Sequence, residues 1–222
     1  PTRRSSDLCP VIIDNMMNLE LLFEATALSG DSTFYNIAVK HADTTMAHHF
    51  RPDNSCYHVV DYDPETGEVR KRQTAQGYAD ESAWARGQAW ALYGYTTCYR
   101  YTKDKKYLDQ AKFFLDARGT TARKDIYLQS HKPVLEQEEA VGHAVRAGYM
   151  YSGMADVAAI TGDSSYIKAI DKIWENIVGK KIYITGGIGA RHAGEAFGDN
   201  YELPNLTAYN ETCAAIGTVY MN

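Results

Sequence analysis

The chain has 222 residues, 45% of them hydrophobic and 23% charged, and 23 Lys and Arg against 28 Asp and Glu give a formal net charge of −5. These values are ordinary for a globular protein of one large or two small domains, and they exclude a disordered, collagen-like or disulfide-scaffold chain. The chain is mildly acidic and has no basic run longer than 70–72, so we expect no nucleic-acid partner.

Membrane association is not expected either. No apolar stretch approaches the roughly 20 residues that span a bilayer, and residues 1–7 lack the apolar core of a signal peptide. We therefore expect a soluble protein, with the cytoplasm and the periplasm both left open as its compartment. The cysteines form no Cys-x-x-Cys pair, so they predict neither a disulfide framework nor a zinc ribbon; they are Cys9, Cys56, Cys98 and Cys213.

The spacing of apolar residues at i, i+3 and i+4, bounded by Asp, Ser and Gly, predicts seven helices. Their expected ranges are 15–29, 33–49, 80–101, 105–117, 134–161, 164–179 and 207–220. One short β-hairpin is expected within residues 58–70, where an apolar run meets a Pro-x-x-Gly turn. The fold class is therefore all-α.

A repeated pattern, Asp-x-x-aromatic-x-x-x-apolar or small, begins at Asp31, Asp104 and Asp163. The Asp caps a new helix and another helix precedes it each time, so the repeating unit is an α/α hairpin. Hairpins at uneven spacing with long loops indicate an α/α toroid and exclude a tetratricopeptide array. Seven helices are fewer than the twelve of an (α/α)6 barrel, so we expect an incomplete barrel whose exposed apolar helix faces favour homo-oligomerisation.

A single carboxylate, Asp14, lies in the otherwise apolar run 12–19 at a helix start. It could be an N-cap that accepts hydrogen bonds from backbone N–H groups. It could instead be a partly desolvated general acid or base with a raised pKa. Its position in the chain leaves both alternatives open.

Large polar and aromatic residues alternate with small ones in residues 83–90, where Trp84, Arg86, Gln88 and Trp90 lie. Such a helix could stack on a sugar face and bind a carboxylate through a guanidinium fork. The alternative is a Trp-rich core stripe with a surface Arg.

Three segments in residues 10–117 closely resemble the unsaturated glucuronyl hydrolases of glycoside hydrolase family 88: IIDNMMNLELL, SCYHVVDYDPETGEV and TAQGYADESAWARGQAWALYGY. The resemblance implies an (α/α)6 barrel that removes unsaturated uronic acid from oligosaccharides by hydrating the C4–C5 double bond, without a cofactor. It implies Asp14 as the general acid/base. It also implies substrate contacts by His58, Gln76, Trp84, Arg86 and Trp90. A second active-site Asp of that family lies upstream of the matched stretch, and this sequence begins after it.

The second half has a different set of loops. Glu211 and Cys213 could chelate one zinc ion, although a zinc site needs three or four ligands. The Gly-rich run 186–189 lacks the Gly-Lys-Ser/Thr ending of a phosphate loop and is expected to be a turn. His143, taken alone, is more typical of a structural helix residue than of a catalytic one.

Four segments in residues 126–222 resemble the zinc-dependent β-L-arabinofuranosidases of glycoside hydrolase family 127: HKPVLEQEEAVGHAVRA, YITGGIGA, GEAFGDNYELPN and NETCAAIG. The resemblance implies Glu195 as the acid/base, Glu211 and Cys213 as two zinc ligands, and His143 as a substrate contact. The cysteine nucleophile of that family and a further cysteine ligand lie downstream of these segments.

The two resemblances divide the chain into parts of two α/α barrels, residues 1–117 and 126–222, joined at 118–125. The first functional hypothesis is a glycoside hydrolase, or part of one, that hydrates unsaturated uronyl oligosaccharides. A zinc-dependent β-L-arabinofuranosidase-like part is the alternative. A catalytically silent helical scaffold or sugar-binding module is a third.

Overall fold

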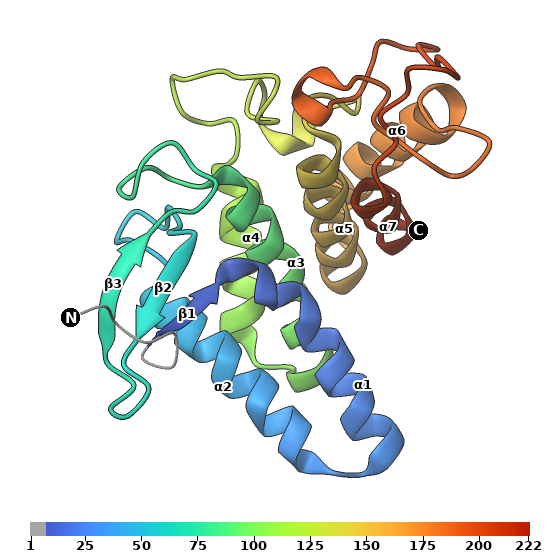
Figure 1. Ribbon diagram of the computed structural model, residues 1–222. Coiled ribbons are helices and arrows are strands. Elements are labelled where there is room, and N and C mark those ends of the chain that lie inside the picture. The colour runs from blue at the N-terminus through green and yellow to red at the C-terminus, as the bar shows by residue number, and fades with distance from the viewer. Residues whose placement is uncertain (1–7) are drawn as a thin grey trace. The chain divides into compact units, whose positions relative to one another are not determined.

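The computed structural model describes residues 8–222, and the contacts divide the chain into two compact units, Pro1–Asp104 (unit 1) and Lys105–Asn222 (unit 2) (Figure 1). Residues 1–7, where no signal-peptide core is expected, lie outside the described residues. Both units are built mainly of helices, which confirms the all-α class of helical hairpins. None of the helices within residues 8–222 combines the length and apolar character needed to cross a membrane.

The helices of unit 1 are α1 (Leu19–Ser29), α2 (Ser32–His48) and α3 (Ala85–Thr102). Helices α1 and α2 pack as a hairpin around the turn that the sequence predicts (Figure 1). Gly30 ends α1 at a φ of 74°, a conformation that glycine adopts at little cost. The side chain of Asp31 accepts a hydrogen bond of 2.8 Å from the backbone N–H of Thr33, so Asp31 caps α2 as expected.

Unit 1 also contains a three-stranded antiparallel sheet in the order β1-β2-β3, with β1 Cys9–Ile12, β2 Val59–Tyr62 and β3 Val69–Gln73. The predicted hairpin is confirmed as β2 and β3, but the expectation that it stands alone is wrong, because β1 pairs with β2, Val11 opposite Val60. A strand of four residues whose partner lies far along the chain has no local turn signal.

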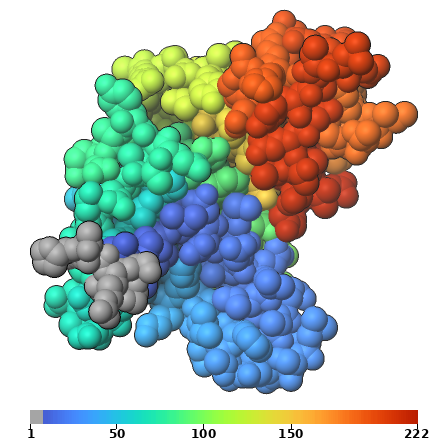
Figure 2. All heavy atoms as spheres, in the orientation of Figure 1, coloured from blue at the N-terminus to red at the C-terminus, as the bar shows by residue number. Residues whose placement is uncertain are grey.

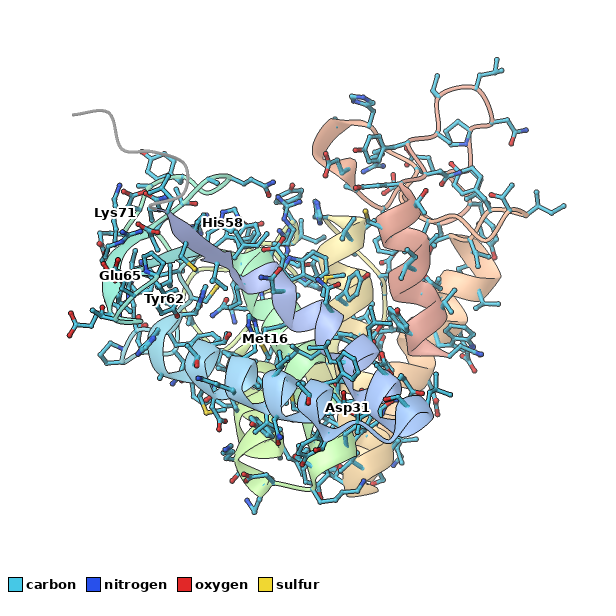
Figure 3. All side chains as sticks on the ribbon, turned by 60° about the horizontal axis from the view of Figure 1, so that its bottom comes forward. Met16, Asp31, His58, Tyr62, Glu65 and Lys71 are labelled. Carbon is cyan, nitrogen blue, oxygen red and sulfur yellow. The ribbon has the colours of Figure 1, made fainter. Side chains whose placement is uncertain are left out.

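The 3-10 helix η2 (Ile13–Asn18) packs closely on α3. A Cβ on Gly94 would lie 2.7 Å from Cβ and 2.8 Å from the backbone oxygen of Met16, and a Cβ on Gly87 would lie 2.7 Å from Cγ2 of Ile13. Met16, which is labelled in Figure 3, is completely buried. The absence of side chains at these two glycines lets η2, and with it Asp14, approach the first turns of α3.

Unit 2 contains α4 (Lys105–Ala117), α5 (Ala144–Thr161), α6 (Ser164–Lys180) and α7 (Thr212–Met221), with 3-10 turns η3 (Val134–Glu136) and η4 (Ala193–Glu195). Helices α5 and α7 meet at two glycines: a Cβ on Gly217 would lie 3.1 Å from Cα of Gly148. Ser152 Oγ also lies 2.8 Å from the carbonyl oxygens of both glycines, which share its single O–H donor. The long segment between α6 and α7 lies on the visible face in orange and red (Figure 2).

The starts of four predicted helices are wrong. The predicted helix 15–29 begins as η2 and becomes α-helical at Leu19, and those expected at 80, 134 and 207 begin at Ala85, Ala144 and Thr212. Side chains satisfy backbone groups ahead of α3 and α5, which stabilises loops in place of helix. Asp80 Oδ1 accepts from Thr74 N, Thr74 Oγ1 from Gly77 N and Asn176 Oδ1 from Ala140 N.

Candidate active site

The fold of unit 1 brings Asp14 to His58. Strand pairing places Ile12 opposite Val59, and the N–H of Ile13 donates to the carbonyl of His58 at 3.1 Å. As a result, Nε2 of His58 lies 3.8 Å from Oδ2 of Asp14. Figure 3 shows the position of His58 next to the sheet. The resemblance implied a role for each residue separately, whereas their juxtaposition comes from the strand β1 that the sequence did not predict.

The imidazole of His58 is held in one tautomer. Its Nδ1 accepts hydrogen bonds from the N–H groups of Ala75 at 3.1 Å and Gln76 at 3.2 Å, so the ring proton of the neutral form is on Nε2, toward Asp14. The ring stacks on Trp84 with centroids 3.7 Å apart and planes 21° from parallel. Burial lowers the pKa of His58 against the opposing charge of Asp14, which favours the neutral ring.

The carboxyl of Asp14 is partly desolvated. Its side chain is 32% exposed, Oδ2 is buried, and no hydrogen-bond partner for Oδ2 lies within the described part of the chain. Burial raises the pKa of Asp14, although its own backbone N–H, His58, Arg86 and Trp90 act in the opposite direction. The N-cap of η2 is Ile12, so the capping interpretation of Asp14 is wrong. The arrangement is that of a carboxyl that can hold and release a proton.

The remaining predicted residues of unit 1 surround this pair. Arg86 Nη2 donates to Oε1 of Gln76 at 2.8 Å, and the guanidinium carbon lies 5.3 Å from the Trp84 ring centroid. Trp84, which precedes α3, and Trp90 are both buried. The exposed amide of Gln76 and the half-buried guanidinium of Arg86 form the polar part of the cluster.

A second cluster lies in unit 2, where His143 meets Glu195. Nε2 of His143 lies 3.0 Å from Oε2 of Glu195, and Nδ1 of His143 accepts from the backbone N–H of Arg146 at 3.0 Å. His143 is therefore the N-cap of α5, with its Nε2–H directed at the carboxylate. Glu195 has a φ of 51°, in the left-handed region that costs energy for a residue with a Cβ.

Several residues around the second cluster were not predicted from the sequence. Tyr209 OH donates to Oε1 of Glu195 at 3.1 Å, so both carboxylate oxygens accept hydrogen bonds. Buried Arg146 donates through Nε to Oε1 of Gln129 at 2.9 Å. The only sequence signal for this arrangement was a charged residue in the otherwise apolar start of α5, three positions after His143.

Glu211 and Cys213 lie at the start of α7, where Glu211 is the N-cap and Cys213 is exposed. Oε2 of Glu211 is buried and has no hydrogen-bond partner within residues 8–222. A buried carboxylate oxygen without a partner fits a cation ligand. No group of three or more His, Cys, Asp or Glu side chains suited to a metal ion occurs in the same residues. The two predicted ligands are thus compatible with zinc as part of a larger set.

Comparisons with known proteins find two kinds of glycoside hydrolase. The family model described as "Beta-L-arabinofuranosidase, GH127 catalytic domain" matches residues 69–222. An unsaturated glucuronyl hydrolase of Formosa agariphila is 46% identical over 162 residues, 71% of this chain and 40% of that protein. A non-reducing end beta-L-arabinofuranosidase of Bifidobacterium longum subsp. longum is 32% identical over 210 residues, 85% of this chain and 28% of that protein.

Solved structures include both kinds. A GH127 beta-arabinofuranosidase superposes with a TM-score of 0.65 at 53% identity, covering 94% of this chain and 30% of that chain. The unsaturated glucuronyl hydrolase of Bacillus sp. GL1 superposes with a TM-score of 0.69 at 22% identity, covering 96% of this chain and 59% of that chain, a likeness of fold alone. These neighbours confirm the helical toroid architecture, and the chain spans less than half the length of either curated relative named above.

Proposed function

The chain belongs to the GH127 family of β-L-arabinofuranosidase catalytic domains, and we propose that it is all or part of a glycoside hydrolase whose unit 1 hydrates unsaturated uronyl oligosaccharides. The choice of reaction rests on the pair formed by Asp14 and His58. Asp14, a carboxyl whose pKa burial raises, faces a neutral His58 that backbone N–H groups hold in a single tautomer. The similarity of most of the chain to an unsaturated glucuronyl hydrolase supports the same choice.

The proposed reaction needs one carboxyl that acts first as an acid and then as a base. Protonated Asp14 delivers its proton to the C4–C5 double bond at C4, and positive charge develops at C5 next to the ring oxygen. A water oxygen then bonds to C5 while the Asp14 carboxylate accepts the water proton, which restores the acid. The hydrated sugar opens by breaking the bond between C5 and the ring oxygen, and C1 then releases the aglycone. Addition to a double bond distinguishes this reaction from displacement by two carboxylates.

Arg86 and Gln76 supply the recognition of the uronate in this proposal. The guanidinium can bind a carboxylate through two parallel N–H donors, and its present partner is the neutral amide oxygen of Gln76 at 2.8 Å. The substrate carboxylate would exchange a neutral acceptor for a charged one, which strengthens the interaction. Trp84 and Trp90, both buried beside the pair, would form the aromatic wall of the subsite.

The test is the ultraviolet absorbance of an unsaturated uronyl disaccharide incubated with the purified chain, because hydration removes the conjugated double bond. Absorbance should fall with the wild-type chain and remain constant with Asp14→Asn. Circular dichroism establishes that both samples are folded. A constant absorbance with folded wild-type chain would reject this function and favour the catalytically silent scaffold or sugar-binding module.

The pair in unit 2 favours a second candidate, hydrolysis of β-L-arabinofuranosides. In this candidate, Glu195 is the acid/base, and His143 orients its carboxylate and contacts the sugar. Glu211 and Cys213 would hold zinc. The zinc would bind and activate the thiolate of the cysteine nucleophile that the family resemblance places downstream of them. Release of the phenol from an aryl β-L-arabinofuranoside by the zinc-supplemented chain, abolished by Glu195→Gln, would support it.

Two features of organisation belong to the same proposal. Residues 118–125 would join the two parts of different barrel character, with 1–117 of glucuronyl hydrolase type and 126–222 of arabinofuranosidase type.

Exposed apolar residues on α1, Leu21 at 72% and Leu28 at 87%, would favour a homo-oligomer. Sedimentation of the wild-type chain and of a Leu21→Lys, Leu28→Lys variant would test the second feature.

A further inference from the structure

Lys181 is a buried cation with no role in the proposed reactions. It follows the last residue of α6, and its side chain is only 3% exposed. Its Nζ donates to the backbone oxygens of Ala140 at 2.8 Å and Gly198 at 3.0 Å, and it lies 2.9 Å from Oε1 of Glu139. A lysine is almost never so buried unless it is paired, and these three partners match its three N–H donors.

The two carbonyls that Lys181 binds come from different loops of the second cluster. Ala140 lies three residues before His143, and Gly198 lies three residues after Glu195. The loops also bind each other directly: the N–H of Phe197 donates to the carbonyl of Gly142 at 2.9 Å, and His143 pairs with Ala196 in a β-bridge. Lys181 therefore crosslinks the segment that carries the histidine to the segment that carries the carboxylate.

A second side chain near the end of α6 makes the same kind of bridge. Asn176 Oδ1 accepts from the N–H of Ala140 at 3.0 Å, and its Nδ2 donates to Oδ1 of Asn200 at 2.9 Å. Asn176 and Lys181 therefore bind both loops at Ala140, Gly198 and Asn200, a few residues along the chain from His143 and Glu195. The end of α6 thus acts as a fixed support for both loops.

We propose that Lys181 is a positioning residue that holds His143 and Glu195 at hydrogen-bond distance. The residue touches neither member of the pair, so it acts only through the backbone at Ala140 and Gly198. Glu195 has a φ of 51°, and a residue in this region keeps its conformation only where the surroundings enforce it. An effect of Lys181 on catalysis rests on the second candidate function. Its effect on the distance between His143 and Glu195 does not depend on any substrate.

The test compares how fast the Nε2 proton of His143 exchanges with water in the wild-type chain and in Lys181→Met. The proton is observed by NMR with ¹⁵N-labelled histidine and assigned by its loss in His143→Gln. Methionine has a similar length but cannot donate to the two carbonyls. We expect exchange of this proton with water to be faster by about tenfold or more in the variant. The control is Tyr166→Phe, which removes a hydroxyl near the start of α6 whose hydrogen-bond partners are Lys112 and Asp116 of α4.

An unchanged exchange rate of the Nε2 proton in folded Lys181→Met, whatever happens to the melting temperature, would overturn the proposal. So would an equal acceleration in Tyr166→Phe, since that would mean a general loss of stability. If Lys181→Met does not fold, Lys181→Gln, which retains an amide donor, takes its place with the same criterion. Where arabinofuranoside hydrolysis is measurable, Lys181→Met should lower kcat more than it raises KM. If no hydrolysis occurs, the second candidate function fails and the NMR result still decides the role of Lys181.

Discussion

Oδ2 of Asp14 and Nε2 of His58 lie 3.8 Å apart, so the carboxyl oxygen is close to the imidazole N–H but too far from it for a normal hydrogen bond. The carboxyl oxygen is therefore near a proton donor without being fixed to it. Backbone N–H groups hold the opposite side of the imidazole, and Trp84 holds its face. In the proposed reaction, this distance leaves Oδ2 able to exchange a proton with the substrate.

Replacement of Asp14 by Asn should abolish turnover of an unsaturated uronyl disaccharide, with a loss of at least about 100-fold, because general acid/base groups contribute factors of this size. The melting temperature should change little, since Asn has nearly the same shape and Asp14 caps no helix. Both quantities can be measured on the same preparation by ultraviolet absorbance and thermal unfolding.

A matched control is Asp31→Ala, because Asp31 does cap a helix and lies away from the site. This variant should lower the melting temperature and leave turnover unchanged. A large loss of stability in Asp14→Asn, comparable to that of Asp31→Ala, would contradict the assignment of Asp14 to chemistry.

Local signals in the sequence predicted the features that depend on neighbouring residues. The cap at Asp31, the glycine that ends α1 and the bounds of α4 follow from contacts within one turn. Features that depend on distant residues could not be read in this way. Strand β1 needs β2 as its partner, and the hydrogen bond from Tyr209 to Glu195 depends on how the loop after α6 folds back.

The same division applies to the candidate sites. The resemblance supplied Asp14 and His58 as separate residues. The tautomer of His58 depends on the loop at Ala75 and Gln76, which the sequence predicted only as a segment before the helix 80–101. Side chains of that loop bond its own backbone, as Thr74 does to Gly77, and such competition with helix formation leaves no periodic pattern in the sequence.

Acid should destabilise the chain in part through His49. The ring is fully buried, and neither of its nitrogens has a hydrogen bond of normal geometry within residues 8–222. Burial, partly offset by the backbone of Tyr57, lowers the pKa of His49 from 6.5 to about 4. Between these two pKa values the unfolded chain takes up a proton that the folded chain does not, so stability falls as the pH falls. The full effect is about 3 kcal/mol, complete below pH 4.

Urea unfolding at pH 7.5 and pH 5 should therefore show a smaller loss of stability in His49→Phe than in the wild-type chain. Burial also lowers the pKa values of His41, His58 and His131, so part of the pH dependence should remain in the variant. Equal slopes for His49→Phe and wild type would show that His49 is not the group responsible.

Close packing of η2 on α3 should make Gly94 intolerant of a methyl group. Gly94→Ala would place Cβ 2.8 Å from the backbone oxygen of Met16, which cannot move without shifting the segment that carries Asp14. We expect a loss of about 1–3 kcal/mol in unfolding free energy, as for other overpacked cores, together with reduced turnover. Gly179→Ala in α6, where a Cβ meets nothing within 4 Å, should instead stabilise the chain by up to about 1 kcal/mol. A stable Gly94→Ala would contradict the close approach.

Zinc should bind weakly to the chain through Glu211 and Cys213. The buried Oε2 of Glu211 has no hydrogen-bond partner in the described residues, and the exposed thiol of Cys213 is accessible to a metal ion. Two protein ligands are fewer than the four of a closed zinc site, so we expect less than one zinc per chain after gel filtration and its complete removal by a chelator. Cys213→Ser should reduce the bound metal further, as measured by elemental analysis, whereas Cys9→Ser, which changes the exposed cysteine of unit 1, should not. One equivalent of zinc that resists chelation would mean that the ligand set is larger than these two residues.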